Sequence, residues 1–414
     1  MSVKEISECR VCGSPKLERV LDLGRHAISD FVVPRQQVER VPLVLMRCDE
    51  CTLVQLRHTV DRERLYRRYW YRSGTNESMI DALLDVAKDP WCHSFLSPGD
   101  HWLDIGANDG TLLGLVGWQY PGIHRIGVEP SESFLLDSGW QMKPGDEQIH
   151  AFFPPPDWIE PKPCKVITSV AMFYDLDDPN EFVAAIKKWL HPEGVWIIQM
   201  STLGQMLDTN AFDNICHEHL EYYSLGSLQN LLSRHDLHIA AFSANEVNGG
   251  SMRIVVRHGT RQSPWTDFPK LGTRAELEIF ASRVSSLRER TRTMLGELLM
   301  DGKLVLGYGA STKGNTLLQY YGIGPDLLPA IADRNPDKCG QVTAGSNIPI
   351  ISEKEMRERQ PDYLMTLPWH FLNSFIQRER ALLETGMRFI VPLPELRVVG
   401  LGDVATACLG QSDG

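Results

Sequence analysis

The segment DNICHEHLEYYS, residues 213 to 224, concentrates side chains that can transfer protons or bind metal ions. Cys216, His217, Glu218 and His219 are consecutive within it. A histidine with a pKa of about 6.5 is available as a base near neutral pH, and a neighbouring carboxylate can orient the ring and stabilise its cation. The residue types therefore fit a proton-transfer centre, a metal site or a polar loop.

The spacing within this segment limits the metal interpretations. A zinc protease helix needs a second histidine four positions after the first, but the residue there is Glu221. His217 and His219 could share a metal ion if the segment were a strand, because residues i and i+2 then lie on one face. We expect His217 to serve structure or substrate contact rather than base chemistry. Tyr222 and Tyr223 are more typical of packing than of acid chemistry.

Four cysteines form two knuckles near the start of the chain, Cys9 and Cys12 in CRVC, and Cys48 and Cys51 in CDEC. Each knuckle offers two sulfurs from one tight turn, so the pair matches a tetrahedral four-thiolate zinc site. Such a site leaves no position for water, and we expect it to be structural. Four unligated cysteines are the alternative, and disulfides fit a reducing compartment poorly.

The segment LDIGANDGTLL is typical of a strand-to-helix turn in an α/β sheet. Its strand ends at Asp104, and Gly106 and Gly110 let a ligand approach the backbone. The dinucleotide pattern GxGxxG is absent, and Asp104 and Asp109 suit a cationic ligand better than a pyrophosphate. Nineteen residues after Gly110, Glu129 can accept hydrogen bonds from two ribose hydroxyls. The combination indicates S-adenosylmethionine rather than NAD, with a nonbinding turn as the alternative.

The hydrophobic pattern predicts two α/β sheets in series to position these motifs. Short apolar runs alternate with helical stretches, as in a doubly wound sheet. Residues 261–270 predict a linker, and a long amphipathic helix follows it. The apolar runs are HWLDIG, RIGVEP, CKVITSVAMF, GVWIIQM and SMRIVVRHG, then KLVLGYG, LLPAIAD, DYLMTLP and FIVPLP, and the helix carries Leu277, Phe280, Val284, Leu287, Leu295 and Leu298.

Composition limits the partners. The chain of 414 residues has a formal net charge of -11 and no run of Lys and Arg, which argues against nucleic-acid binding. Nowhere do eighteen apolar residues run together, and MSVKEISECR lacks an apolar signal core, so we expect neither membrane spanning nor secretion. We expect a cytoplasmic monomer whose partner is a small molecule.

The order and spacing of several motifs resemble one known family. They are CRVC with CDEC, YWYRSG at 69–74, DIGANDG, FDNICHEHLEYYS, GYGASTKGN at 307–315 and PDYLMTLPWH at 361–370. Over nearly its whole length the chain resembles the three-domain sugar C-methyltransferases, a group of class I methyltransferases. The resemblance implies an α/β fold, with a doubly wound methyltransferase sheet between a small zinc domain and a C-terminal Rossmann-like domain. The expected boundaries are 1–62 for the zinc-binding domain, 63–260 for the methyltransferase domain, 261–300 for the linker and long helix, and 301–414 for the substrate-binding Rossmann-like domain.

The family's reaction makes defined demands on these residues. Methylation of a carbon beside a ketone requires a base, donors for the enolate oxygen and an aligned sulfonium methyl group. By resemblance, S-adenosylmethionine is the donor, and the acceptor is a nucleotide-linked keto-deoxysugar gripped partly by the C-terminal domain. His219 matches the catalytic base, Glu218 its adjacent carboxylate, and Tyr71 an aromatic hydroxyl near the acceptor, with Tyr69 as the fallback. The implied cofactor residues are Asp104, Gly106, Asn108, Gly110, Glu129, Pro130, Ala171 and Met172.

The motif GYGASTKGN predicts a second ligand-binding turn. Its backbone amides and Lys313 favour an anionic phosphate, so we expect it to bind the diphosphate of a sugar nucleotide. A tight turn that packs this domain against the catalytic one is the alternative. Trp369 and His370 follow another predicted strand and could face the same cleft. The predicted acceptor contacts are Tyr174, Asp175, His217, Tyr222, Tyr308, Ser311, Lys313 and Asn315.

The chain departs from the deoxysugar enzymes beside the predicted base. Those enzymes tend to have Tyr-Asp-Glu-His where this chain has Cys216, His217, Glu218 and His219. The proton-transfer pair is therefore retained, whereas the acceptor pocket differs. Two other functions stay open: an O- or N-methyltransferase acting on a related sugar or specialised metabolite, and a noncatalytic binding protein with the same fold.

Overall fold

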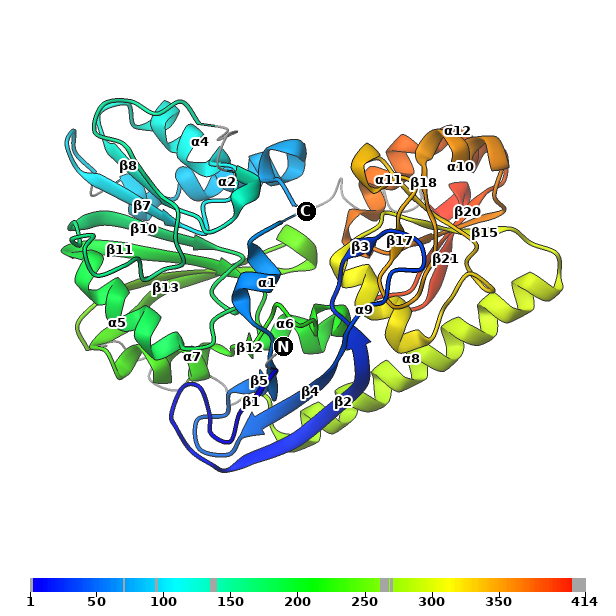
Figure 1. Ribbon diagram of the computed structural model, residues 1–414, viewed down its shortest axis with the longest axis horizontal. Coiled ribbons are helices and arrows are strands. Elements are labelled where there is room, and N and C mark those ends of the chain that lie inside the picture. Colours follow the sequence, from blue (N-terminus) through cyan, green and yellow to red (C-terminus); the bar gives the residue numbers. More distant parts are fainter. Residues whose placement is uncertain are drawn as a thin grey trace.

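The computed structural model describes residues 3–69, 71–93, 96–134, 140–260, 268 and 271–403. It contains a small antiparallel sheet, two α/β sheets, and a long helix that runs beside the second α/β region (Figure 1). Of the linker predicted at residues 261–270, only Phe268 is among the described residues. Within the described part of the chain, no helix is both long enough and apolar enough to cross a membrane.

The first α/β sheet has the strand order β13-β14-β11-β10-β7-β8-β9. The five strands from β11 to β9 are parallel, and β14 and β13 are added antiparallel at one edge. Helices cover both faces, α2 and α4 on one and α5 and α7 on the other, which explains the continuous apolar runs of the strands. The elements are β7 (His101–Ile105), β8 (His124–Val128), β9 (Glu147–Ile149), β10 (Cys164–Val170), β11 (Leu190–Met200), β13 (Leu237–Asn245), β14 (Ser251–His258), α2 (Glu77–Ala87), α3 (Pro90–His93), α4 (Thr111–Gln119), α5 (Pro179–Trp189), α6 (Leu203–Asp208) and α7 (Leu225–Ser233).

The second α/β sheet has the order β18-β16-β15-β19-β20-β21 and is parallel except for the edge strand β21. Together the two sheets confirm the predicted α/β fold. The elements are β15 (Val305–Tyr308), β16 (Ile331–Asp333), β18 (Ile350–Ser352), β19 (Tyr363–Thr366), β20 (Arg388–Val391), β21 (Arg397–Val399), α9 (Thr312–Tyr321), α10 (Glu353–Arg359), α11 (Leu372–Arg378) and α12 (Arg380–Glu384).

The predicted amphipathic helix is α8 (Arg274–Met300). A capping box fixes its start, because the side chains of Thr273 and Glu276 each accept a hydrogen bond from the other's backbone amide. Five of its predicted apolar residues are fully buried, and Leu298 is partly buried. The helix packs against strand β2 of the N-terminal region and against α9, so it contacts both the N-terminal and the C-terminal regions.

The N-terminal region forms a small antiparallel sheet with the order β12-β5-β4-β2. β12 (Glu221–Tyr222) belongs to the HEHLE segment, and it pairs with β5. A further strand of this region, β3, pairs with β17 (Val342–Thr343) from the C-terminal α/β region. The N-terminal region is therefore hydrogen-bonded to both larger regions. Its remaining elements are β1 (Lys4–Glu5), β2 (Leu17–Ala27), β3 (Phe31–Val32), β4 (Arg40–Cys48), β5 (Val54–Leu56), β6 (His58–Thr59) and α1 (Arg62–Tyr66).

Each α/β sheet has one point where the strand order reverses. In the first sheet it lies between β7 and β10, and in the second between β15 and β19. Ligands of open α/β sheets bind outside the carboxyl ends of the strands at such points.

Candidate active site

A single cleft of about 2500 Å³ extends between the three regions. The carboxyl ends of β7, β8 and β10 form one wall, and those of β15 and β16 form another. Residues around Phe31 and Arg62 of the N-terminal region complete it. The sequence did not predict this third wall, because cysteine spacing does not reveal which neighbour a zinc-binding region covers.

Glu129 lies in the cleft at the end of β8. Its Oε2 accepts a hydrogen bond from the Asn108 backbone amide at 2.8 Å, and its Oε1 accepts one from the Ser131 amide at 2.8 Å. Burial raises the pKa of the Glu129 carboxyl. Because each oxygen can accept a further hydrogen bond, the carboxylate suits the two hydroxyls of a ribose.

The backbone beside Glu129 leaves room for a ligand. Gly106 has a φ of 72°, and a Cβ placed there would lie 3.0 Å from the Cγ atom of Met172. Ala171 also has a positive φ, of 54°, directly after β10. Gly106, Asn108, Pro130, Ala171 and Met172 all line the cleft. These residues fit the expected S-adenosylmethionine.

Asp104 is buried at the end of β7 and also lines the cleft. Its Oδ1 accepts a hydrogen bond from the Thr168 hydroxyl at 2.7 Å. Burial raises the pKa of Asp104 to about 7. This carboxyl group therefore ties β7 to β10 as well as facing the cofactor pocket.

Two residues of the glycine turn act differently from the prediction. Gly110 does not line the cleft; it precedes α4 with a φ of 78°, and a Cβ there would overlap the Trp140 ring. Asp109 is also absent from the cleft wall, because its carboxylate accepts from the Gly74 amide at 2.8 Å and from the Thr111 hydroxyl at 2.6 Å. Both residues therefore shape the loop.

His219 has its ring oriented by the backbone. Its Nδ1 lies 2.8 Å from the carbonyl oxygen of Asn214. A carbonyl oxygen can only accept, so Nδ1 carries the proton and Nε2 keeps a free lone pair. The ring also packs on Tyr174, with 4.3 Å between ring centroids. Burial, and then the charge of Lys313, lower the pKa of His219 to about 3, so the imidazole is neutral.

Glu218 adjoins this histidine but does not orient it. A Glu218 oxygen, a His219 ring nitrogen and the Cys216 sulfur lie within 4.8 Å of one another. Burial, and then Asp30, raise the pKa of Glu218 to about 7. The orienting role expected of Glu218 belongs to the Asn214 carbonyl, which sequence could not reveal because main-chain groups leave no signature.

Tyr69 and Tyr71 both line the cleft, and Tyr69 packs 6.1 Å between ring centroids from Tyr66, whose hydroxyl donates to the Glu218 carbonyl at 3.2 Å. Burial raises the pKa of Tyr69 well above its usual range, followed by the charges of Glu218 and Asp175. Burial also raises the pKa of Tyr71, to about 12, but the neighbouring charge there is Asp109 of the glycine turn. Tyr71 is 42% exposed, and its carbonyl accepts from the Asn108 side chain at 3.0 Å.

Lys313 reaches the same centre from the C-terminal region. It lines the cleft, and its charge lowers the pKa of both His219 and His370. Burial lowers the pKa of Lys313 itself, whereas Asp213 raises it. Trp369 donates from Nε1 to the Asp213 carboxylate at 3.0 Å, which fastens the C-terminal region to the segment before His219.

Three predicted acceptor contacts do not line the cleft. His217 is buried, its Nε2 lies 3.1 Å from the Val41 carbonyl oxygen in β4, and it is not part of the Cys216, Glu218 and His219 group. Tyr222 donates from its hydroxyl to the Asn214 carbonyl at 3.3 Å. Asn315 donates to the Asp30 carbonyl at 3.0 Å. The sequence predicted each of the three as an acceptor contact because it is a polar residue in a predicted ligand-binding motif. In the structure each side chain instead forms a hydrogen bond to a backbone carbonyl of another segment.

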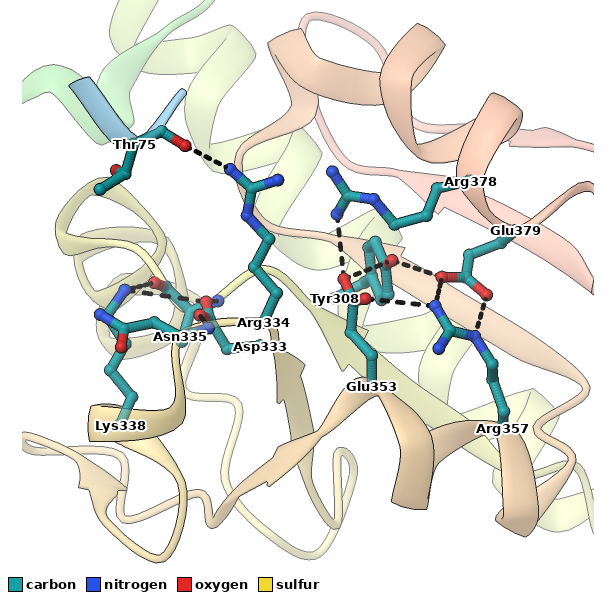
Figure 2. Close-up of polar contacts among 11 residues, drawn as sticks. Thr75, Tyr308, Asp333, Arg334, Asn335, Lys338, Glu353, Arg357, Arg378 and Glu379 are labelled. Atoms are coloured by element: carbon teal, nitrogen blue, oxygen red, sulfur yellow. Dashed lines mark hydrogen bonds and ion pairs between the residues drawn. The ribbon is translucent and has the colours of Figure 1, made fainter. Parts of the chain in front are cut away.

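The other acceptor candidates do line the cleft, although two have committed hydroxyl groups. Tyr308 donates to Glu379 at 2.6 Å and lies 2.8 Å from Glu353 (Figure 2). The Ser311 hydroxyl caps α9 by accepting from the Gly314 amide at 3.0 Å. Tyr174, Asp175 and Lys313 remain as side chains whose functional groups adjoin His219 or one another.

The four N-terminal cysteines converge. Their sulfurs lie within 4.8 Å of one another, with 3.5 Å between Cys9 and Cys51 and between Cys12 and Cys48. Four sulfurs at about 2.3 Å from a tetrahedral zinc ion would be separated by about 3.8 Å, so the cluster fits the metal. In each knuckle the residue directly after the second cysteine has a positive φ, 71° at Gly13 and 62° at Thr52, and the chain turns there.

The chain is similar to known methyltransferases. Three family models match the chain in order: a zinc binding domain over residues 9–66, a methyltransferase domain over 71–241, and a C-methyltransferase C-terminal domain over 246–394. The chain is an S-adenosylmethionine-dependent methyltransferase with these three domains in order. Its cofactors are S-adenosylmethionine and zinc, and the four-cysteine cluster suits the zinc ion.

A similar curated relative of this methyltransferase is the C-methyltransferase NovU of Streptomyces niveus. The two are 29% identical over 418 residues, which cover 96% of this chain and 98% of the relative. Among solved structures, mitomycin 7-O-methyltransferase MmcR is 16% identical with a TM-score of 0.35, covering 45% of this chain and 55% of that one. The plantazolicin methyltransferase BpumL in complex with SAH is 13% identical with a TM-score of 0.34, covering 44% and 90%.

Proposed function

We propose that this enzyme is a C-methyltransferase that removes a proton from the carbon beside the ketone of a nucleotide-linked sugar and methylates that carbon. The observation that carries the proposal is the hydrogen bond from His219 Nδ1 to the Asn214 carbonyl at 2.8 Å. It leaves Nε2 of a neutral imidazole free to accept a proton within the cleft. The C-methyltransferase C-terminal domain model and the likeness to NovU support the carbon acceptor.

The buried surroundings suit enolate formation. When bound, S-adenosylmethionine supplies an electrophilic methyl group. His219 accepts the proton at Nε2, and its low pKa rises as negative charge develops on the acceptor beside it. Glu218, within 4.8 Å of the ring, then stabilises the imidazolium. The sequence of events needs no metal ion at the Cys216, Glu218 and His219 group.

The enolate oxygen needs donors, and two groups are available. Tyr69 lines the cleft and packs against Tyr66, whose hydroxyl donates to the Glu218 carbonyl, so it lies beside the segment that holds His219. Lys313 brings a cation whose influence reaches His219. Donors held in a buried site stabilise developing charge more strongly than they would in water. We therefore propose Tyr69, instead of Tyr71, as the aromatic hydroxyl that donates to the enolate oxygen.

Replacement of the proposed base provides the test. His219→Asn keeps an amide that can donate to Asn214 but lacks the Nε2 base, so turnover should fall at least about 100-fold. The assay supplies carbon-13 methyl-labelled S-adenosylmethionine with a panel of nucleotide-linked 4-keto-6-deoxyhexoses and follows the label by NMR. In deuterium oxide without the methyl donor, the wild-type enzyme should exchange the proton beside the ketone, and the variant should not.

Two controls make the result decisive. His219→Asn should bind S-adenosylhomocysteine as the wild type does, because the Glu129 pocket is unchanged. His217→Gln, two positions away but outside the cleft, should keep turnover within a few fold. Full turnover by His219→Asn would overturn the proposal, and so would a label attached to oxygen or nitrogen.

A further inference from the structure

Cys216, Glu218 and His219 bring three different metal-binding groups together. Their ligand atoms, a sulfur, a carboxylate oxygen and a ring nitrogen, all lie within 4.8 Å of one another. The Cys216 Sγ lies 4.0 Å from the Glu218 Oε2. A sulfur and an oxygen bound to one tetrahedral zinc ion would be separated by about 3.6 Å, so this pair needs only a small inward movement to hold one.

The ring of His219 is prepared as a metal ligand. Its Nδ1 donates to the Asn214 carbonyl at 2.8 Å, so the lone pair is on Nε2. A ring N–H held by a carbonyl oxygen commonly supports a metal-binding histidine, because it fixes both the tautomer and the direction of the ring. The carbonyl that leaves Nε2 free for a proton therefore also leaves it free for a metal ion.

The group is open to the cleft on one side. Glu218 and His219 line the cleft, whereas Cys216 is 2% exposed and is not part of the cleft wall. A cation can enter from the cleft, and three protein ligands leave the fourth tetrahedral position to water. Lys313, whose charge reaches His219, opposes a cation there, but a thiolate and the Glu218 carboxylate together supply two negative charges in its favour.

The thiol decides which cation fits. Thiolate and imidazole ligands favour zinc and related transition metals, whereas Mg²⁺ and Ca²⁺ prefer oxygen ligands. Cys216 is also a position where this chain departs from the deoxysugar enzymes, which tend to have tyrosine there. This chain therefore carries, beside its proposed base, a metal-binding sulfur in place of that tyrosine.

We infer that Cys216, Glu218 and His219 form a second metal site, which takes zinc or a similar transition metal from the cleft and blocks proton removal while the metal is bound. Binding releases the thiol proton to solvent and occupies the Nε2 lone pair, so His219 cannot accept a proton. The closed four-thiolate site fills first, and the block begins beyond one zinc ion per chain. Metal binding is independent of the proposed function, and only the block of proton removal rests on it.

A cobalt titration tests the site without turnover, because thiolate-bound Co²⁺ absorbs in the near ultraviolet and tetrahedral Co²⁺ absorbs in the visible. The wild-type protein, shown by elemental analysis to hold one zinc ion per chain, would be titrated with CoCl₂. A further metal ion should bind with both absorption bands while the zinc content stays unchanged. Cys216→Ser keeps the four N-terminal cysteines, and it should bind Co²⁺ at least about 10-fold more weakly and without the thiolate band.

Cys339→Ser is the matched control, because it removes a partly buried thiol outside this group and should leave the cobalt titration unchanged. Unaltered S-adenosylhomocysteine binding by Cys216→Ser would show that this variant folds. A wild-type protein that binds no further Co²⁺, or a thiolate band that persists in Cys216→Ser, would overturn the metal site.

Proton exchange in deuterium oxide tests the block. Exchange by the wild type with one zinc ion should fall at least about 10-fold when ZnCl₂ fills the second site, and a weak chelator should restore it. In Cys216→Ser the same loss should need at least about 10-fold more ZnCl₂. Unchanged exchange with the second site filled would overturn the inhibitory role. Absence of exchange before any second metal ion is added is a failure of the proposed function, and the cobalt titration still decides the metal site.

Discussion

The carbonyl oxygen of Asn214 determines what His219 can do. It accepts hydrogen bonds from Nδ1 of His219 and from the Tyr222 hydroxyl. Two side chains, five and eight positions later in the chain, therefore share one acceptor. The fixed tautomer follows from this geometry and not from the neighbouring Glu218. A histidine held by a carbonyl keeps its base nitrogen free without placing a permanent negative charge on the ring's other side.

His217 gives a prediction about acid stability. Burial lowers the pKa of His217 to about 4, whereas an unfolded histidine has about 6.5. Above pH 6.5 the His217 imidazole is neutral in both the folded and the unfolded state. As pH falls towards 4, it becomes protonated in the unfolded state but stays largely neutral in the folded state. Stability present above pH 6.5 is therefore lost, by about 3 kcal/mol at pH 4. His217→Gln can still donate to Val41 and should lack this loss.

Urea unfolding at several pH values between 7 and 4 would measure the difference. The free energy of unfolding of His217→Gln should rise relative to the wild type as pH falls, and acid effects at the zinc cluster cancel because both proteins contain it. Replacement of the exposed His150 by Gln is the control and should leave the curve unchanged. Parallel pH curves for His217→Gln and the wild type would contradict the prediction.

The two histidines also show where residue-level prediction ends. Both lie in one motif with similar neighbours, and the sequence left open a metal ion shared by them. Which ring faces the cleft is decided by the Val41 carbonyl of β4, far away in the sequence. Positions that follow from local spacing could be predicted from sequence alone: the four cysteines converge, and Glu129 lies in the cleft at the end of β8.

At the scale of elements, the start of α4 depends on Gly110. Its φ of 78° lies in the left-handed region, and a Cβ would overlap the Trp140 ring. Gly110→Ala should therefore lower the free energy of unfolding by at least about 2 kcal/mol, from backbone strain and overpacking together. It should also weaken S-adenosylhomocysteine binding, because the adjacent Asn108 amide holds Glu129.

Substitution of Gly99 separates the effect of backbone strain from the effect of overlap with the Trp140 ring. It has a φ of 92° but open space around its Cα, so Gly99→Ala carries strain without overlap. Chemical denaturation of both variants would measure the difference, and calorimetry would measure the ligand affinity. Equal losses in the two variants would show that the Trp140 contact contributes nothing.

Element prediction succeeded where the pattern was local and failed where it was not. Every apolar run predicted as a strand overlaps one, from β7 to β20, and the spacing of Leu277 to Leu295 predicted α8. The strands β3, β12 and β17 have two residues each, too few for any periodicity. They exist because distant segments offer unpaired backbone groups, and they are the strands that join the regions.

At the scale of the whole molecule, we expect the zinc cluster to support the cleft as well as the fold of the N-terminal region. The knuckles anchor the sheet that supplies one wall of the cleft and that pairs with β12, directly after His219. Metal removal should therefore abolish methyl transfer, whereas S-adenosylhomocysteine affinity should change less than about threefold, because Glu129 belongs to another sheet. A structural zinc site contributes folding energy to its region directly.

Chelation followed by calorimetry and the NMR methyl-transfer assay would check this. Stoichiometric zinc should restore activity to the wild-type protein and fail to restore it to Cys12→Ser. Full activity of protein shown to be metal-free by elemental analysis would contradict the expectation. The assembly of three regions around one cleft is also what sequence could predict least, since each region's motif is complete without the others.

The pairing of β12 with β5 bears on how such enzymes diversify. Residues 213–224 belong to the methyltransferase region by their place in the chain, but their backbone partners lie within residues 1–62. A recombinant that exchanged only the N-terminal region with a relative would set foreign strands against the segment that holds His219. We therefore expect residues 1–62 and 213–224 to function only as a matched pair. A chimera of two relatives should acquire the acceptor specificity of one parent only when both segments come from that parent.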